Sequence, residues 1–92
     1  MKQLGVIDRL GADSARWTLR NDTREAIMVH VEPEGDQIPV RPGSTLIVQV
    51  EGGTRPRGGE PPLEVLTGDS IVTVWSQWPG SLVAVHLDGK AR

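Results

Sequence analysis

The two histidines of the chain each stand two residues before a carboxylate. His30 precedes Glu32 in one segment, and His86 precedes Asp88 in another. Residues two apart on a β-strand project from the same face of the sheet. If the strands expected near 26–32 and 82–88 were neighbours in suitable register, the four side chains could surround one ion. Two imidazoles and two carboxylates would suit zinc or iron.

The apolar pattern around these residues favours surface histidines over a metal site. Each histidine alternates with residues that we expect to point into the core, namely Ile27, Val29 and Val31 in the first segment and Val83, Val85 and Leu87 in the second. Both imidazoles would then lie on an outer, solvated face, which gives a metal little shielding and few supporting contacts. Asp88 also precedes Gly89 and fits a turn equally well. We therefore predict no metal and no cofactor, and keep the four residues as a metal candidate.

Other catalytic patterns are weak. Ser44 and Ser81 both follow Pro-Gly, but neither lies in the Gly-x-Ser-x-Gly sequence that exposes a nucleophile between a strand and a helix. Three carboxylates within five residues, Glu32, Glu34 and Asp36, lack the further ligands of a calcium loop and indicate a solvated acidic turn. We assign no catalytic residue, and a non-enzymatic role is the preferred interpretation.

Two tryptophans and an edge strand are the best binding candidates. Trp75 and Trp78 are placed at a strand end and a turn tip, and tryptophan is enriched at the energetic centres of interfaces. Alternatively, Trp75 caps the core and Trp78 folds over Pro79. A short strand at 38–40 contains Pro39, which cannot donate a ladder hydrogen bond and so indicates an edge. We predict partner contacts at Trp78, Trp75 and Ile38.

Composition narrows the class of partner and the compartment. The chain has 92 residues, with 12 acidic and 10 basic residues interspersed, which is unlike the massed basic face of a nucleic-acid-binding protein. No apolar run reaches the roughly 18 residues that cross a membrane. Asp8 and Arg9 interrupt the first residues before any long apolar run, so we expect no secretory signal. With no cysteine present, this predicts a cytoplasmic protein, without nucleic-acid or membrane partners.

Apolar residues alternate with polar ones almost throughout, which predicts an all-β domain over residues 1–92. We expect about seven short antiparallel strands in a sandwich of immunoglobulin-like or cupredoxin-like character, with a small cupin-like barrel as the alternative. The run at 71–75 is apolar on both faces and is predicted to be a central strand. Residues 51–62 hold four Gly and three Pro and are expected to form a flexible loop.

Several turn motifs resemble those of a group of small bacterial all-β proteins of unknown function. The shared features are Asn-x-Thr, Val-x-x-Glu-Pro-x-Gly, Pro-Gly-Ser and Trp-Pro-Gly, seen here at 21–23, at 29–35, at 42–44 and at 78–80. The resemblance implies a small β domain and no particular activity. Cupredoxins differ because their copper site needs a cysteine, and the paired histidines of cupins are missing here.

These observations favour a non-catalytic interaction domain that binds a protein partner or a second copy of itself. Two alternatives remain. One is a metal-binding domain or enzyme that uses His30, Glu32, His86 and Asp88. The other is a carbohydrate-binding module, which would need Trp75 and Trp78 exposed together as a flat stacking surface.

Overall fold

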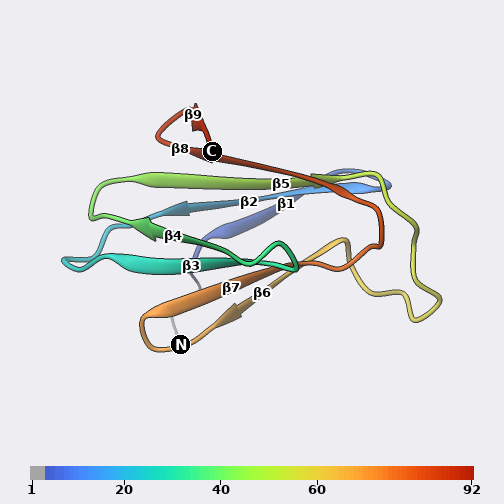
Figure 1. Ribbon diagram of the computed structural model, residues 1–92, viewed down its shortest axis with the longest axis horizontal. Coiled ribbons are helices and arrows are strands. Elements are labelled where there is room, and N and C mark those ends of the chain that lie inside the picture. Colours follow the sequence, from blue (N-terminus) through green and yellow to red (C-terminus); the bar gives the residue numbers. More distant parts are fainter. Residues whose placement is uncertain (1–3) are drawn as a thin grey trace.

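The computed structural model describes residues 4–92, which form two β-sheets packed face to face (Figure 1). Nine strands are present: β1 (Val6–Gly11), β2 (Ser14–Arg20), β3 (Ile27–Glu32), β4 (Asp36–Val40), β5 (Thr45–Glu51), β6 (Leu63–Thr67), β7 (Ile71–Ser76), β8 (Leu82–Leu87) and β9 (Lys90–Ala91). No helix occurs in this part of the chain, so none of it forms a membrane-crossing helix. The all-β sandwich predicted from the sequence is confirmed.

The strands are divided between a five-stranded sheet and a four-stranded sheet. Sheet A has the order β1-β2-β5-β8-β9, and sheet B has the order β4-β3-β7-β6. The two layers remain separate sheets, so the barrel alternative was wrong. All pairings are antiparallel except that between β3 and β7, which is parallel. The sequence prediction of a purely antiparallel fold missed this pair.

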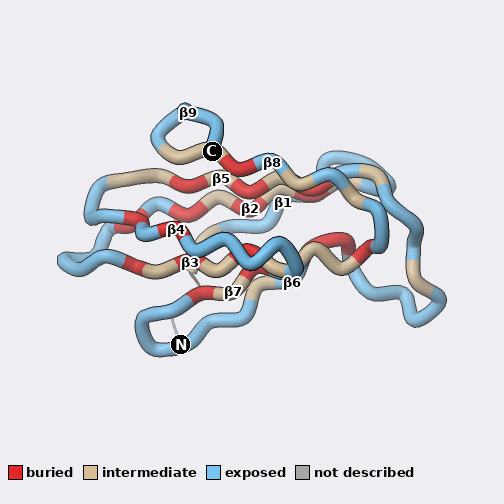
Figure 2. Tube along the Cα trace, in the orientation of Figure 1, coloured by how far each residue is buried: buried red, intermediate tan, exposed pale blue. Residues whose placement is uncertain are grey.

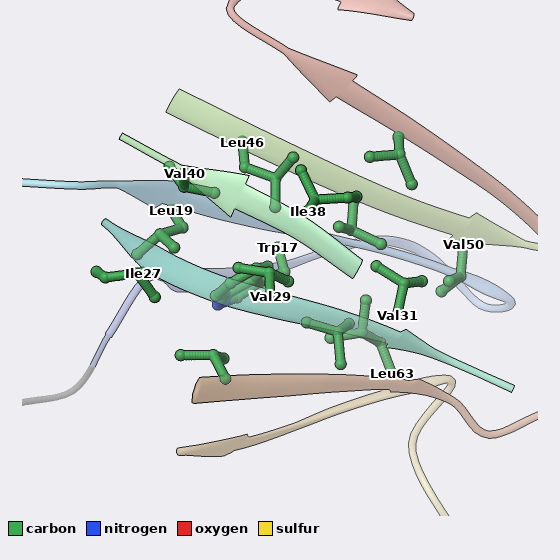
Figure 3. Packing of buried hydrophobic residues seen from close by; sticks show 14 of the residues in the cluster. Trp17, Leu19, Ile27, Val29, Val31, Ile38, Val40, Leu46, Val50 and Leu63 are labelled. Carbon is green, nitrogen blue, oxygen red and sulfur yellow. The ribbon is translucent and has the colours of Figure 1, made fainter. Parts of the chain in front are cut away.

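The core lies between the two sheets and is built from the alternating apolar rows. Trp17 of β2 is fully buried and packs among valine, leucine and isoleucine side chains from both layers (Figure 3). The rows that begin at Ile27, at Leu46 and at Val83 point inward, as the period-two pattern predicts. Each side chain removed from water contributes to the main favourable term in folding. Along β2, β3 and β5, buried residues alternate with intermediate ones (Figure 2).

Strand β7 is central in sheet B, as its apolar sequence predicts. It lies between β3 and β6, and its inward residues Val72 and Val74 are at most 1% exposed. Its outward residues are Ile71, Thr73 and Trp75, two of which are large and apolar. The outward side chains of β7 therefore form a second apolar row, and no other strand of the described residues packs over it.

Two strands at the ends of the chain were missed. Strand β1 pairs only with β2, and all six of its residues are exposed. Its sequence contains the adjacent charges of Asp8 and Arg9, which obscure any alternation. Strand β9 has two residues and pairs with the end of β8.

Candidate functional site

The two histidine-carboxylate pairs lie in different sheets. His30 and Glu32 are on β3 in sheet B, whereas His86 is on β8 in sheet A and Asp88 follows that strand. The metal hypothesis requires β3 and β8 to be neighbouring strands. They are not neighbours, because the chain crosses from one sheet to the other between these two segments. Among residues 4–92, no group of three or more His, Cys, Asp or Glu side chains is placed to hold a metal ion. The structure thus does not bring the four candidate ligands together.

Asp88 instead closes the end of the β5–β8 pair. Its carboxylate accepts hydrogen bonds from the Thr45 backbone N–H and the Ser44 hydroxyl, both at 2.9 Å. Its own backbone N–H donates to the Thr45 carbonyl at 2.9 Å. The hydrogen bonds from Thr45 and Ser44 lower the pKa of Asp88, and the positive charge of Lys90 adds to this effect. The turn role that the sequence offered for Asp88 is the one the structure shows.

Trp78 is buried and does not form an external contact surface. Its side chain is 4% exposed, and its indole N–H donates to the Glu60 carbonyl at 2.8 Å. The guanidinium of Arg55 lies over the ring, 5.5 Å from its centroid. The segment 52–62 covers the ring that the turn would otherwise expose, so Trp78 offers no exposed side chain for the partner contact, which stays a prediction.

The segment 52–62, called here the 52–62 loop, is irregular as expected, and hydrogen bonds connect it to the neighbouring β7–β8 turn. The Thr54 N–H donates to the Pro79 carbonyl at 2.9 Å, and the Gln77 N–H donates to the Pro62 carbonyl at 3.0 Å. Trp78 contacts Arg55 and Glu60 of the same loop, so the loop is attached toward both of its ends. Its expected flexibility stays a prediction.

Ile38 is also buried, at 3% exposed, although β4 is an edge strand of sheet B as predicted. The inward face of β4 carries Ile38 and Val40, and the outward face carries Gln37 and Pro39. Ile38 therefore offers no exposed side chain for the partner contact, which stays a prediction.

Trp75 is the one predicted contact residue whose side chain reaches solvent, with 39% of it exposed. It lies near the end of β7 on the outer face of sheet B. Its neighbours across the sheet are Glu32 on β3 and Glu64 on β6, because each of these is the register partner of Trp75. Directly paired residues point to the same face, with Cβ atoms about 5 Å apart.

Three further apolar side chains share this face with Trp75. Ile71 is 44% exposed and Leu66 is 52% exposed. Leu66 is paired with Thr73 and so lies diagonally between Ile71 and Trp75, within reach of both. Met28 is paired with Ile71 and is half-buried. We call the set Met28, Leu66, Ile71 and Trp75 the sheet B patch.

The sequence predicts a contact at Trp75 and a two-sided apolar run that includes Ile71, but it does not predict that Met28 and Leu66 join them on one face. The run at 71–75 is the sequence signal for this patch. A strand that is apolar on both faces needs a packing partner on each face, and sheet B packs against the core on one side only.

The other large apolar residues that are exposed among residues 4–92 are Val6, Ile7 and Leu10 of β1 and Leu82 of β8, and none of these is the register partner of another. Val6 and Ile7 are both exposed on β1, but they pair with Thr18 and Trp17 respectively and so point to opposite sides of sheet A. Leu82 is 70% exposed at the start of β8, three strands away from β1 in that sheet. Single exposed apolar residues are ordinary, whereas a contiguous group on one face indicates a contact surface.

No protein-family model, curated protein or solved structure matches this chain. The resemblance of its turn motifs to small bacterial β proteins therefore stays a prediction.

Proposed function

We propose that this chain is a non-catalytic interaction domain that binds a protein partner through the outer face of sheet B. The observation that supports this proposal is the sheet B patch, in which Leu66, Ile71 and Trp75 expose large apolar side chains on one regular surface. Flat sheet faces with a central tryptophan suit macromolecular contacts, because the ring supplies a large contact area at low cost in conformational entropy.

The alternatives lack a comparable feature. The carbohydrate-binding hypothesis needs two exposed rings, and Trp78 is buried. The metal hypothesis needs ligands that the two sheets keep apart. The cytoplasmic location expected from the sequence stays a prediction.

The proposal can be tested by selection from a phage-displayed library of random 12-residue peptides. The wild-type domain is the target, and the double variant Leu66→Ser, Ile71→Thr provides counter-selection. Both substitutions keep the strand and remove apolar surface. Leu82→Thr is the matched control, because it removes an exposed leucine from sheet A.

The proposal predicts peptides that bind the wild-type protein and the Leu82→Thr variant equally, and the double variant at least tenfold more weakly. Peptides that bind all three proteins alike, or no enriched peptide, would contradict it. Sedimentation of the free domain measures its oligomeric state, which distinguishes a second copy of the domain from a different protein as the partner. A dimer that dissociates on introduction of the double substitution would show that the partner is a second copy.

A further inference from the structure

From the surroundings of Trp75, we infer that the partner places a cationic side chain, arginine or lysine, over this ring between Glu32 and Glu64. This inference rests on the proposed function and specifies the chemistry of the partner. Its first support is the register, which sets one carboxylate on each side of the same indole, from β3 and from β6.

The outer face of sheet B carries two carboxylates and neither lysine nor arginine to neutralise them. The outward positions of sheet B are Gln37, Pro39, Met28, His30, Glu32, Ile71, Thr73, Trp75, Glu64 and Leu66. They include two carboxylates, and neither Lys nor Arg. Within residues 4–92, the one ion pair is between Arg20 and Asp22, so Glu32 and Glu64 have no cationic partner there.

The protein itself provides a comparison for this geometry. Trp78 already has a cation over its ring, from Arg55 at 5.5 Å, and that ring is buried. Trp75 has no such neighbour among the described residues, although two carboxylates flank it. A cation placed over an exposed tryptophan gains about 0.5–1 kcal/mol from the ring. Flanking carboxylates add electrostatic attraction for the same group.

Charge also argues against a second copy as the occupant. A two-fold dimer built on this face around Trp75 would bring Glu32 and Glu64 of one protomer close to the same residues of its partner. Like charges placed opposite one another in an interface cost binding free energy and disfavour that pairing. A basic segment of another protein has the opposite sign and meets the carboxylates favourably.

The test uses two small probes that differ in charge but hardly in shape: N-acetyl-arginine methylamide and N-acetyl-citrulline methylamide. Each is titrated into ¹⁵N-labelled protein, and the indole N–H signals of Trp17, Trp75 and Trp78 are followed by NMR. The variant Glu32→Gln, Glu64→Gln removes both charges and keeps the side-chain shape. The variant Glu25→Gln, Glu51→Gln is the control, because it removes two exposed carboxylates elsewhere.

We expect the arginine probe to shift the Trp75 signal about two- to fivefold more strongly than citrulline, which is the factor that an exposed cation–π contact of about 0.5–1 kcal/mol gives. This preference should become smaller in the Glu32/Glu64 variant, which keeps the ring but loses both carboxylate charges, and should be unchanged in the control variant. Equal shifts from both probes, or a preference unchanged in the Glu32/Glu64 variant, would overturn the inference.

The peptide selection separates this result from failure of the proposed function. If selected peptides need the sheet B patch but the arginine preference is absent, then the interaction domain stands and the cation assignment fails.

Discussion

Glu32 lies directly opposite Trp75 across the parallel pair of β3 and β7, and both side chains point away from the core. This relationship depends on a crossover between strands that are 43 residues apart at their first register pair, Met28 and Ile71. It creates a surface that combines an indole, carboxylates and aliphatic side chains. The proposed function depends on this surface.

Trp78 stabilises the 52–62 loop and the β7–β8 turn together. Replacing Trp78 with alanine removes a buried ring, its hydrogen bond to Glu60 and its contact with Arg55. We expect a loss of about 3–5 kcal/mol in the free energy of unfolding, as for other buried aromatic residues. Urea denaturation measures this value. Trp78→Phe keeps most of the apolar contact and should lose clearly less, and equal stability of Trp78→Ala and wild type would contradict the assigned packing.

Asn21 connects three segments at one end of the sandwich. It is fully buried, and its amide N–H groups donate to the carbonyls of Glu25 and Val40 at 2.8 and 2.7 Å. Its side-chain oxygen accepts from the backbone and hydroxyl of Thr23. Asn21→Ala leaves several of these groups without partners, at about 1–3 kcal/mol each when buried. We expect at least about 2 kcal/mol of destabilisation by urea denaturation.

A matched pair of variants at Thr23 tests the same network. Thr23→Ser keeps the hydroxyl that donates to Asn21, whereas Thr23→Val removes it and keeps the side-chain shape. Thr23→Ser should therefore be the more stable variant. The reverse order would show that the hydroxyl does not support Asn21.

Asp88 should make stability depend on pH in the acid range. Its pKa is lowered in the folded protein by the hydrogen bonds from Thr45 and Ser44. A carboxyl group with a lowered pKa stabilises the folded state above its unfolded pKa, which is about 3.9, and this contribution is lost as the pH falls through the folded pKa. Asp88→Asn keeps an acceptor oxygen and tolerates the positive φ of this position, 51°. The difference in unfolding free energy between wild type and Asp88→Asn should shrink from pH 6 to pH 2.5, and a constant difference would contradict the linkage.

Gly5 is required by the close approach of Trp17. A Cβ atom at Gly5 would collide with the Trp17 indole nitrogen and would lie 2.9 Å from the Thr18 carbonyl oxygen, at a φ of +79°. Gly43 has a similar φ of +85° and no heavy atom within 4 Å of its added Cβ. Gly43→Ala therefore measures the backbone strain alone, and Gly5→Ala adds the collision. Thermal unfolding should show Gly5→Ala as the less stable of the two, and equal melting temperatures would exclude the steric effect.

The sequence predicted much of the fold because seven strands carry a regular alternation of apolar and polar residues. It also predicted the central position of β7, because the run at 71–75 is apolar on both faces. It did not predict which strands are neighbours. The parallel pairing of β3 with β7 depends on how the chain crosses between layers, and no local pattern encodes that path.

The candidate site was predicted in part, and the failures have a common cause. Trp78 and Ile38 looked exposed because a turn tip and an edge strand are usually solvent-accessible. The cover over Trp78 comes from Arg55 and Glu60, in a loop whose Gly-rich and Pro-rich sequence gives no indication of where it packs. Trp75 was a correct candidate for an exposed position, but its neighbours Glu32 and Glu64 became apparent only from the strand register.

The most direct test of the central claim is to map the footprint of a library-selected peptide on the domain by ¹H–¹⁵N NMR. The account predicts that the largest shift changes fall on Met28, Leu66, Ile71, Thr73 and Trp75, and that the Trp17 and Trp78 indole signals stay in place. A footprint centred on β1 or on the 52–62 loop would contradict it, because the contact surface would then lie outside the exposed face of sheet B.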